Sequence, residues 1–142
     1  MPRLDSPAAP VLVIGAANMD IAAWTPHGLA PGDSTPGTIR HAPGGVARNV
    51  AENLARLGHA VQLLCAVGDD LFGRSLLAQT GAAGVDVGGC WVWPDAATST
   101  YLSLHGADGD MAVAVNDMAI VDRIAPAHLA PCAPWLRRCA AL

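Results

Sequence analysis

Apolar and polar positions alternate along the chain in blocks that predict strands and helices in turn. Short apolar runs at residues 11–15, 60–67 and 90–93 have the length and the β-branched or aromatic content of buried strands. Residues 46–57 and 69–81, which lie between these runs, carry apolar side chains at helical spacing. Strand, helix, strand, helix, strand is the order of an α/β fold with parallel crossover units, and we expect this fold class.

The two predicted helices begin differently. The first follows a glycine pair directly, ends before Gly58, and is predicted to have one apolar face made of Val46, Val50, Leu54 and Leu57. The second begins after Gly68, with Asp69 as the expected N-cap, and ends at Gly81 and Gly84. Its inner side is predicted to hold Leu71, Phe72, Leu76 and Leu77.

Extended segments with polar side chains surround this α/β pattern. Residues 38–41 predict a short exposed strand after a loop. Residues 98–105 and 110–115 alternate polar and apolar side chains, which predicts an antiparallel hairpin closed by Asn116 and Asp117. One face of the hairpin is open either to a ligand or only to solvent.

The C-terminal part of the sequence predicts one more helix. It covers residues 126–138, and Pro131 and Pro134 are expected to divide it. Residues 140–142 have the character of a strand start, so we expect the pattern to continue beyond Leu142.

Composition narrows the class of protein. The 142 residues are 52% hydrophobic and 14% charged, with a net charge of −4 and no cluster of basic residues, so a nucleic-acid partner is not expected. No apolar run reaches about 18 residues, so no membrane span is expected. Residues 1–10 lack the features of a signal peptide, which indicates a cytoplasmic protein.

Cysteine and histidine spacing indicates no metal site. The four cysteines form no CxxC pair, and free thiols are favoured over the alternative of a disulfide or zinc framework. The five histidines show no spacing typical of metal ligands, so we predict no metal site.

A glycine pair before the first helix is the first candidate binding site. Gly44 and Gly45 precede the helix, and Asn49 lies within its first turn. Glycines let a ligand approach the backbone, and the N–H groups of a helix start point toward it, which suits hydroxyl or anionic groups. A plain loop-to-helix junction is the alternative interpretation.

Asn18 and Asp20 form the second candidate, just after the first strand. In extended backbone they point the same way. A carboxylate beside an amide suits a vicinal diol, which offers two O–H donors. Turn-forming Asn and Asp are the alternative. The sequence has no GxGxxG motif there, so a dinucleotide site is not predicted.

Three motifs in series resemble the N-terminal half of the ribokinase-like, or PfkB-type, sugar and nucleoside kinases. They are Gly15-Ala16-Ala17-Asn18-Met19-Asp20, Pro43-Gly44-Gly45-Val46-Ala47-Arg48-Asn49 and Ala66-Val67-Gly68-Asp69-Asp70-Leu71-Phe72-Gly73. They occur in the family's order and spacing between residues 15 and 73. The Val-Ala-Arg sequence before Asn49 is most similar to the pseudouridine kinase subgroup, as are residues 34–37, 101–104 and 114–118.

The resemblance implies a ribokinase-like three-layer sandwich, of which residues 1–142 form the N-terminal part. It implies a small antiparallel β lid from approximately residues 21–41 and 98–117. The lid would cover the sugar and could join two subunits as a homodimer. For the complete enzyme the resemblance implies ATP and Mg²⁺, and this part of the chain is expected to bind neither.

The resemblance also implies roles for individual residues. Asp20 would accept hydrogen bonds from the sugar hydroxyls with assistance from Asn18, and the sugar would be held by Gly44, Gly45 and Asn49. A sugar or nucleoside is the expected small-molecule partner, with pseudouridine favoured. Candidates for recognising its base are Tyr101, Ser103, Asn116 and Asp117.

One departure from the family limits these expectations. The family's catalytic aspartate lies in a Gly-Ala-Gly-Asp motif, and this sequence contains none, nor the ATP-binding segments. We therefore assign no catalytic residue and expect the chain alone to be inactive. The alternatives are a stand-alone sugar-binding or oligomerisation module without chemistry, or a kinase for ribose or another sugar. The unfinished strand at Leu142 favours the kinase interpretation.

Overall fold

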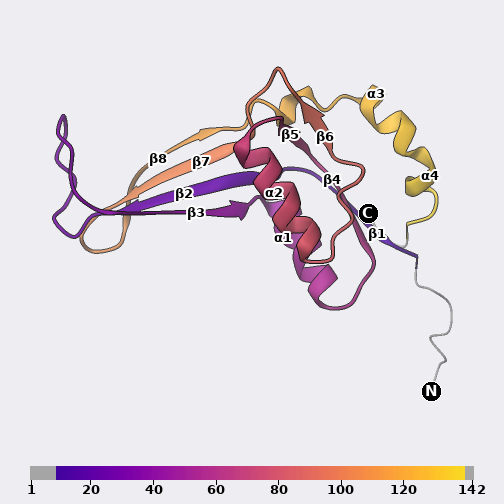
Figure 1. Ribbon diagram of the computed structural model, residues 1–142, viewed down its shortest axis with the longest axis horizontal. Coiled ribbons are helices and arrows are strands. Elements are labelled where there is room, and N and C mark those ends of the chain that lie inside the picture. The colour runs from indigo at the N-terminus through magenta and orange to yellow at the C-terminus, as the bar shows by residue number, and fades with distance from the viewer. Residues whose placement is uncertain (1–8, 140–142) are drawn as a thin grey trace.

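The computed structural model describes residues 9–139. Figure 1 shows a body in which two helices lie across short strands, and a long sheet that extends away from this body. We call this second part the projecting sheet. Within the described residues, no helix has the length and apolar content of a membrane span. The strand expected at 140–142 lies outside the described residues.

The body is built on parallel strand pairs, which confirms the predicted α/β class. Its crossover helices are α1 (Val46–Arg56) and α2 (Leu71–Ala82). The predicted strand at 60–67 is interrupted at Cys65 and forms two strands. The pairs are β1 (Val11–Ile14) with β4 (Val61–Leu64), and β5 (Ala66–Gly68) with β6 (Trp91–Trp93).

Helices cover both faces of these strands because successive side chains of a strand point in opposite directions. Leu63 and Cys65 belong to the core against α1 and α2. Leu64, between them, packs with Leu12 and Cys132 against the C-terminal helices. The predicted divided helix is confirmed as α3 (Pro126–Leu129), η2 (Ala130–Cys132) and α4 (Ala133–Leu136), which follow η1 (Val121–Arg123). The body is therefore a three-layer arrangement.

Helix α1 packs through small residues, so its predicted apolar face is wrong at three of four positions. Val46, Val50 and Leu57 are 81%, 46% and 76% exposed, and Leu54 alone packs against the core. Small side chains let the helix lie close to the strands. The contact is made by Ala47, Ala51 and Ala55. Gly58 follows the helix with φ +90°, as predicted.

Helix α2 has Asp70 as its N-cap, so the prediction of Asp69 is wrong. The Asp70 carboxylate accepts a hydrogen bond from the Gly73 N–H at 2.8 Å, whereas Asp69 pairs with Arg74 on the surface. On the predicted inner side, Leu76 is buried, but Leu71 is 73% exposed. The first residue of the helix therefore faces solvent.

The projecting sheet has the strand order β3-β2-β7-β8, in which β2 and β7 are parallel and the other pairs antiparallel. The predicted hairpin is confirmed, with Asn116 and Asp117 inside its second strand instead of beyond it. The exposed strand predicted at 38–41 is longer. The strands are β2 (Asn18–Trp24), β3 (Thr38–Gly44), β7 (Thr100–His105) and β8 (Met111–Asp117).

Candidate functional site

The candidate site begins where β2 and β3 meet the body. Asn18 and Gly44 are paired across these strands, and Asp20 follows on the same face. The side-chain amide of Asn18 donates to Asp20 Oδ1 at 2.5 Å. A Cβ on Gly44 would collide with the Asp20 carboxylate. The absence of a side chain at Gly44 therefore leaves the space that the carboxylate occupies.

The second glycine of the pair fixes the turn into α1. Gly45 has φ +97°, and a Cβ there would lie 2.6 Å from the Ala16 carbonyl oxygen. This close contact brings the glycine pair against the segment that leads into β2, so the first two sequence motifs form one site. Among the described residues, no side chain caps the first turn of α1.

Asn49 is exposed, and its side-chain oxygen accepts a hydrogen bond from the residue before it, Arg48. Arg48 is only 8% exposed, and its Nη1 donates to Asn49 Oδ1 at 3.0 Å and to the Pro43 carbonyl at 3.2 Å. The sequence motifs predicted no role for Arg48. The signal was the spacing of Arg48 and Glu52, four residues apart on a helix, which favours the ion pair that they form.

Three of the four base-recognition candidates share the face of the projecting sheet that carries Asp20. Strand register aligns Asp20, Tyr101 and Asn116 in one row across β2, β7 and β8. Ser103 lies on the same face, is buried, and its Oγ lies 3.1 Å from His105 Nε2. Asp117 pairs with Thr100 and so lies on the opposite face. Its carboxylate accepts from the Ala119 N–H at 3.2 Å.

The third motif supports the start of β7. Asp70 accepts hydrogen bonds from the Thr98 N–H at 2.8 Å and the Thr98 hydroxyl at 2.7 Å. Burial opposes ionisation of Asp70, but hydrogen bonds from Gly73 and Thr98 outweigh it and hold the pKa of Asp70 below its usual value. Ser99 then accepts from the Met19 N–H at 2.8 Å, which joins β7 to β2.

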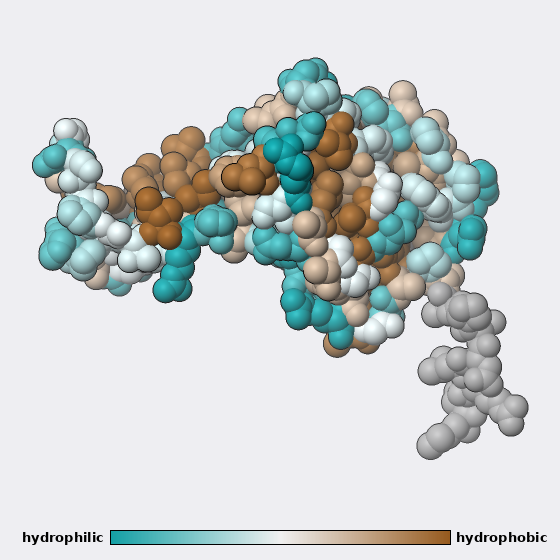
Figure 2. All heavy atoms as spheres, in the orientation of Figure 1, coloured by the Kyte–Doolittle hydropathy of each residue, from teal (hydrophilic) through white to brown (hydrophobic). Residues whose placement is uncertain are grey.

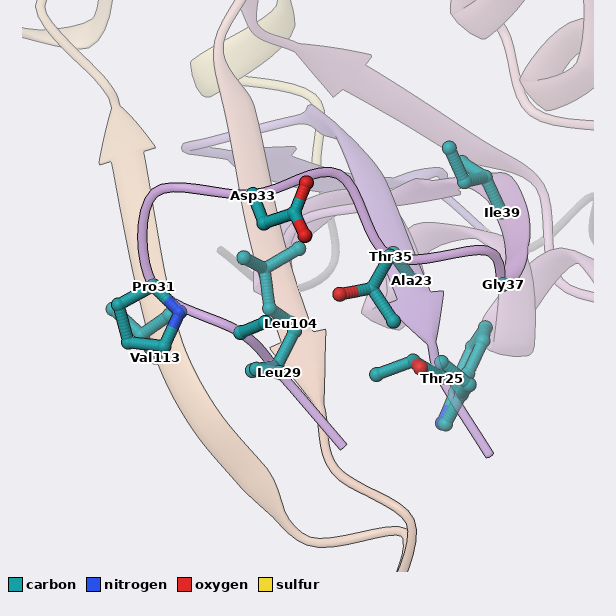
Figure 3. Close-up of a pocket in the computed structure, with 12 residues that line it drawn as sticks. Ala23, Thr25, Leu29, Pro31, Asp33, Thr35, Gly37, Ile39, Leu104 and Val113 are labelled. Atoms are coloured by element: carbon teal, nitrogen blue, oxygen red, sulfur yellow. The ribbon is translucent and has the colours of Figure 1, made fainter. Parts of the chain in front are cut away.

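The other face of the projecting sheet is apolar. Figure 2 shows hydrophobic side chains gathered on this sheet, and its exposed members are Ile39, Leu102, Val113 and Val115. In Figure 3 the loop at residues 25–37 passes over Leu104 and Val113. The loop and strands enclose a cavity of about 520 Å³. Because this cavity lies on the face opposite Asp20, we do not assign it to the candidate site.

Metal ligands do not gather in the part of the chain that the structure describes: no group of three or more His, Cys, Asp or Glu residues occurs there. All four cysteines, at positions 65, 90, 132 and 139, are free thiols, as predicted.

Comparison with known proteins identifies the family to which this chain belongs. Residues 8–135 match the pfkB family of carbohydrate kinases, and the chain belongs to this family. The body and the projecting sheet are the N-terminal part of the ribokinase-like fold, as the resemblance implied.

The chain is similar in sequence and in structure to individual kinases of this family. The chain is 47% identical to Escherichia coli pseudouridine kinase over 90% of its own length and 41% of that protein. Among solved structures, it matches a provisionally assigned sugar kinase from Clostridium perfringens with TM-score 0.86 and 27% identity, over 95% of this chain and 42% of that one. A Xylella fastidiosa fructokinase with bound ATP matches with TM-score 0.72 and 25% identity, over 89% and 39%. The chain thus spans about two fifths of the length of these relatives.

Proposed function

We propose that this chain is the sugar-binding part of an ATP-dependent kinase that phosphorylates a sugar 5′-hydroxyl, with pseudouridine as the substrate. The observation that carries the proposal is the Asp20 carboxylate, held by Asn18 in the space that Gly44 leaves open. The similarity to a pseudouridine kinase supports the choice of substrate.

The sugar would bind through its hydroxyl groups. Asn18 uses one acceptor oxygen of Asp20, and the other, Oδ2, lies beside Gly44. An ionised carboxylate only accepts hydrogen bonds, so it suits a ribose diol, whose O–H groups donate. The space of a side chain is filled at Gly44 by the Asp20 carboxylate and at Gly45 by the backbone of Ala16 and Ala17, so the two glycines would hold the sugar by placing Asp20 and the turn. Asn49 would complete the contact from α1.

The base would lie along the row of polar side chains that begins at Asp20. Asn116 offers an amide, which can both donate and accept, as the N–H and C=O groups of a uracil ring require. Tyr101 offers a hydroxyl oxygen that can accept, while its proton is directed to Met111 Sδ at 3.3 Å. Ser103 is less available, because its Oγ is already near His105. Asp117 is the weakest of the proposed base contacts, because it lies on the other face.

In this proposal residues 21–41 and 98–117 of the projecting sheet act as a lid, and residues 1–142 as the N-terminal part of a kinase domain. Closing a lid over a bound sugar excludes water and so favours transfer over hydrolysis. The apolar face would then remain outside the sugar pocket, where it can contact a second subunit in a homodimer. This face is also what favours the alternative of an oligomerisation module.

ATP and Mg²⁺ belong to the complete enzyme in this proposal, and the residues present do not fit them. Arg48, the basic side chain beside Asn49, is paired with Glu52 and hydrogen-bonded to three further groups, so it does not offer a cation to a triphosphate. The Gly-Ala-Gly-Asp motif is absent from the sequence. We therefore derive no catalytic step and propose that the chain alone does not transfer phosphate.

A calorimetric titration tests this function. Pseudouridine should bind the chain more tightly than uridine or ribose, and Asp20→Ala should remove binding without loss of the fold. Asp122→Ala is the matched control, because Asp122 is an exposed carboxylate of η1, outside the proposed site. If ribose bound more tightly than either nucleoside, the proposed substrate would be a simple sugar and not pseudouridine. Equal affinity of Asp20→Ala and the unmodified chain would exclude Asp20 from the site.

A further inference from the structure

The buried side chain of Arg48 lies between α2 and the turn at Gly44 and Gly45. The Arg48 side chain donates from Nε to Thr80 Oγ1 at 3.1 Å and from Nη1 to Pro43 O at 3.2 Å and Asn49 Oδ1 at 3.0 Å. Its Nη2 forms an ion pair with Glu52. Every nitrogen of the guanidinium therefore has a partner, which makes a buried charge tolerable.

Through these contacts the planar guanidinium group of Arg48 connects three elements, α1, α2 and β3. Thr80 lies in α2, is fully buried, and donates its own hydroxyl to the Leu76 carbonyl at 2.7 Å, so its oxygen is fixed as an acceptor for Arg48. Pro43 lies at the end of β3, directly before Gly44. The planar guanidinium thus fixes the turn at Gly44 relative to α1 and α2.

The contact with Asn49 decides which way that amide faces. A guanidinium has only N–H donors, so it must be met by the amide oxygen of Asn49. With Oδ1 engaged, the two N–H donors of Asn49 Nδ2 remain for another partner. Asn49 is exposed, so a bound molecule can reach them.

We infer that Arg48 is a positioning residue, which orients the Asn49 amide so that its NH₂ group donates to the sugar. Asp20 accepts hydrogen bonds and Asn49 donates them, so neighbouring hydroxyls, each a donor and an acceptor, can satisfy both. The part of this inference that concerns the sugar rests on the proposed function. The orientation of Asn49 by Arg48 does not.

The chain offers a matched control for the loss of Arg48. Arg56 also pairs with Glu52, from the next turn of α1, but its side chain is exposed, and its Nε donates to Glu52 Oε1 instead of to Asn49 or Pro43. Arg56→Gln removes one of the two arginines that pair with Glu52 and leaves the contacts of Arg48 intact. Arg48→Lys keeps the charge but has a single nitrogen, which cannot span Asn49, Pro43 and Thr80 together.

Nuclear magnetic resonance of the chain without ligand tests the orientation. The ¹⁵N relaxation of the Asn49 side-chain NH₂ group should report an ordered amide in the unmodified chain and in Arg56→Gln, and a mobile one in Arg48→Gln and Arg48→Lys. An amide that stays ordered in the Arg48 variants would overturn the inference. This result does not depend on sugar binding, so it stands whether or not the proposed function is correct.

Titration with pseudouridine tests the consequence. We expect Arg48→Lys to weaken binding about tenfold and Arg56→Gln to leave it unchanged. Asn49→Asp provides a second test that does not depend on the folding of the Arg48 variants. A carboxylate at position 49 still accepts the hydrogen bond from Arg48, but it has no N–H group to donate to the sugar. This variant should keep the thermal stability and lose affinity by a similar factor. Unchanged affinity of Asn49→Asp would contradict the donor role of Asn49. Failure of the unmodified chain to bind pseudouridine would instead contradict the proposed function.

Discussion

At the scale of single residues, two adjacent glycines are required for different physical reasons. Gly45 needs its left-handed backbone, with φ +97°, and also lacks room for a Cβ beside Ala16. Gly44 has no positive φ, and what excludes a side chain there is the Asp20 carboxylate. Gly44 therefore sets the position of Asp20, which makes it part of the proposed binding chemistry.

Replacement of Gly44 by alanine should displace the Asp20 carboxylate and weaken pseudouridine binding by about tenfold or more, while the backbone of β3 accepts the change. The control is Gly81→Ala in α2, where a Cβ would meet only Val87 at an ordinary 3.7 Å and alanine favours the helix. Calorimetry with both variants compares the affinities. Normal affinity of Gly44→Ala would show that Asp20 is not held by the space at Gly44.

At the scale of elements, Asp70 joins a helix start to a strand start. It caps α2 through Gly73 and holds Thr98, 28 residues away, just before β7. The local sequence Gly68-Asp69-Asp70 cannot distinguish its two aspartates as caps, because the distant partner Thr98 decides between them. The contact thus fixes where the hairpin leaves the body.

Asp70→Asn should lower the free energy of unfolding by about 1–2 kcal/mol, because an amide oxygen still caps Gly73 but the NH₂ group cannot accept from the Thr98 N–H, and Asp69→Asn should change it little. Urea unfolding at neutral pH measures both. Because folding lowers the pKa of Asp70 below 3.8, its stabilisation is complete above that pH and is lost as the pH falls through the folded value. The difference between the unmodified chain and Asp70→Asn should therefore shrink in acid. A constant difference would contradict the assignment of the shift to Asp70.

The order of elements could be predicted because it depends on local periodicity. Asn18, Asp20 and the glycine pair could be proposed as a site from local motifs, and the structure brings them together. Two features could not. The face of α1 that packs consists of three alanines and Leu54, because small side chains let the helix approach the strands closely. The row from Asp20 to Asn116 depends on strand register across β2, β7 and β8, and register joins residues that are far apart in the sequence.

At the scale of the whole molecule, the projecting sheet has one polar face and one apolar face. The apolar face exposes Ile39 at 71% and Val115 at 65%. Contiguous exposed apolar surface of this kind is typical of interaction sites. In our proposal the polar face binds the sugar and the apolar face contacts a second copy of the chain.

Val115→Asp should convert a dimer of the chain into a monomer, because a carboxylate would be buried without a partner at the contact. Val92→Asp is the control, since Val92 is also an exposed strand valine but lies on β6 in the body. Sedimentation equilibrium measures whether each variant is a monomer or a dimer. A monomeric unmodified chain, or a Val115→Asp chain that still dimerises, would remove this face from the proposed subunit contact.

A crystal structure of the chain with pseudouridine bound would test the proposed binding site most directly. We expect ribose hydroxyls within hydrogen-bond distance of Asp20 Oδ2 and the Asn49 NH₂ group, with the base along the row toward Asn116. Pseudouridine in the cavity beneath the loop at residues 25–37, on the apolar face, would show that the polar face of the projecting sheet is not the binding site.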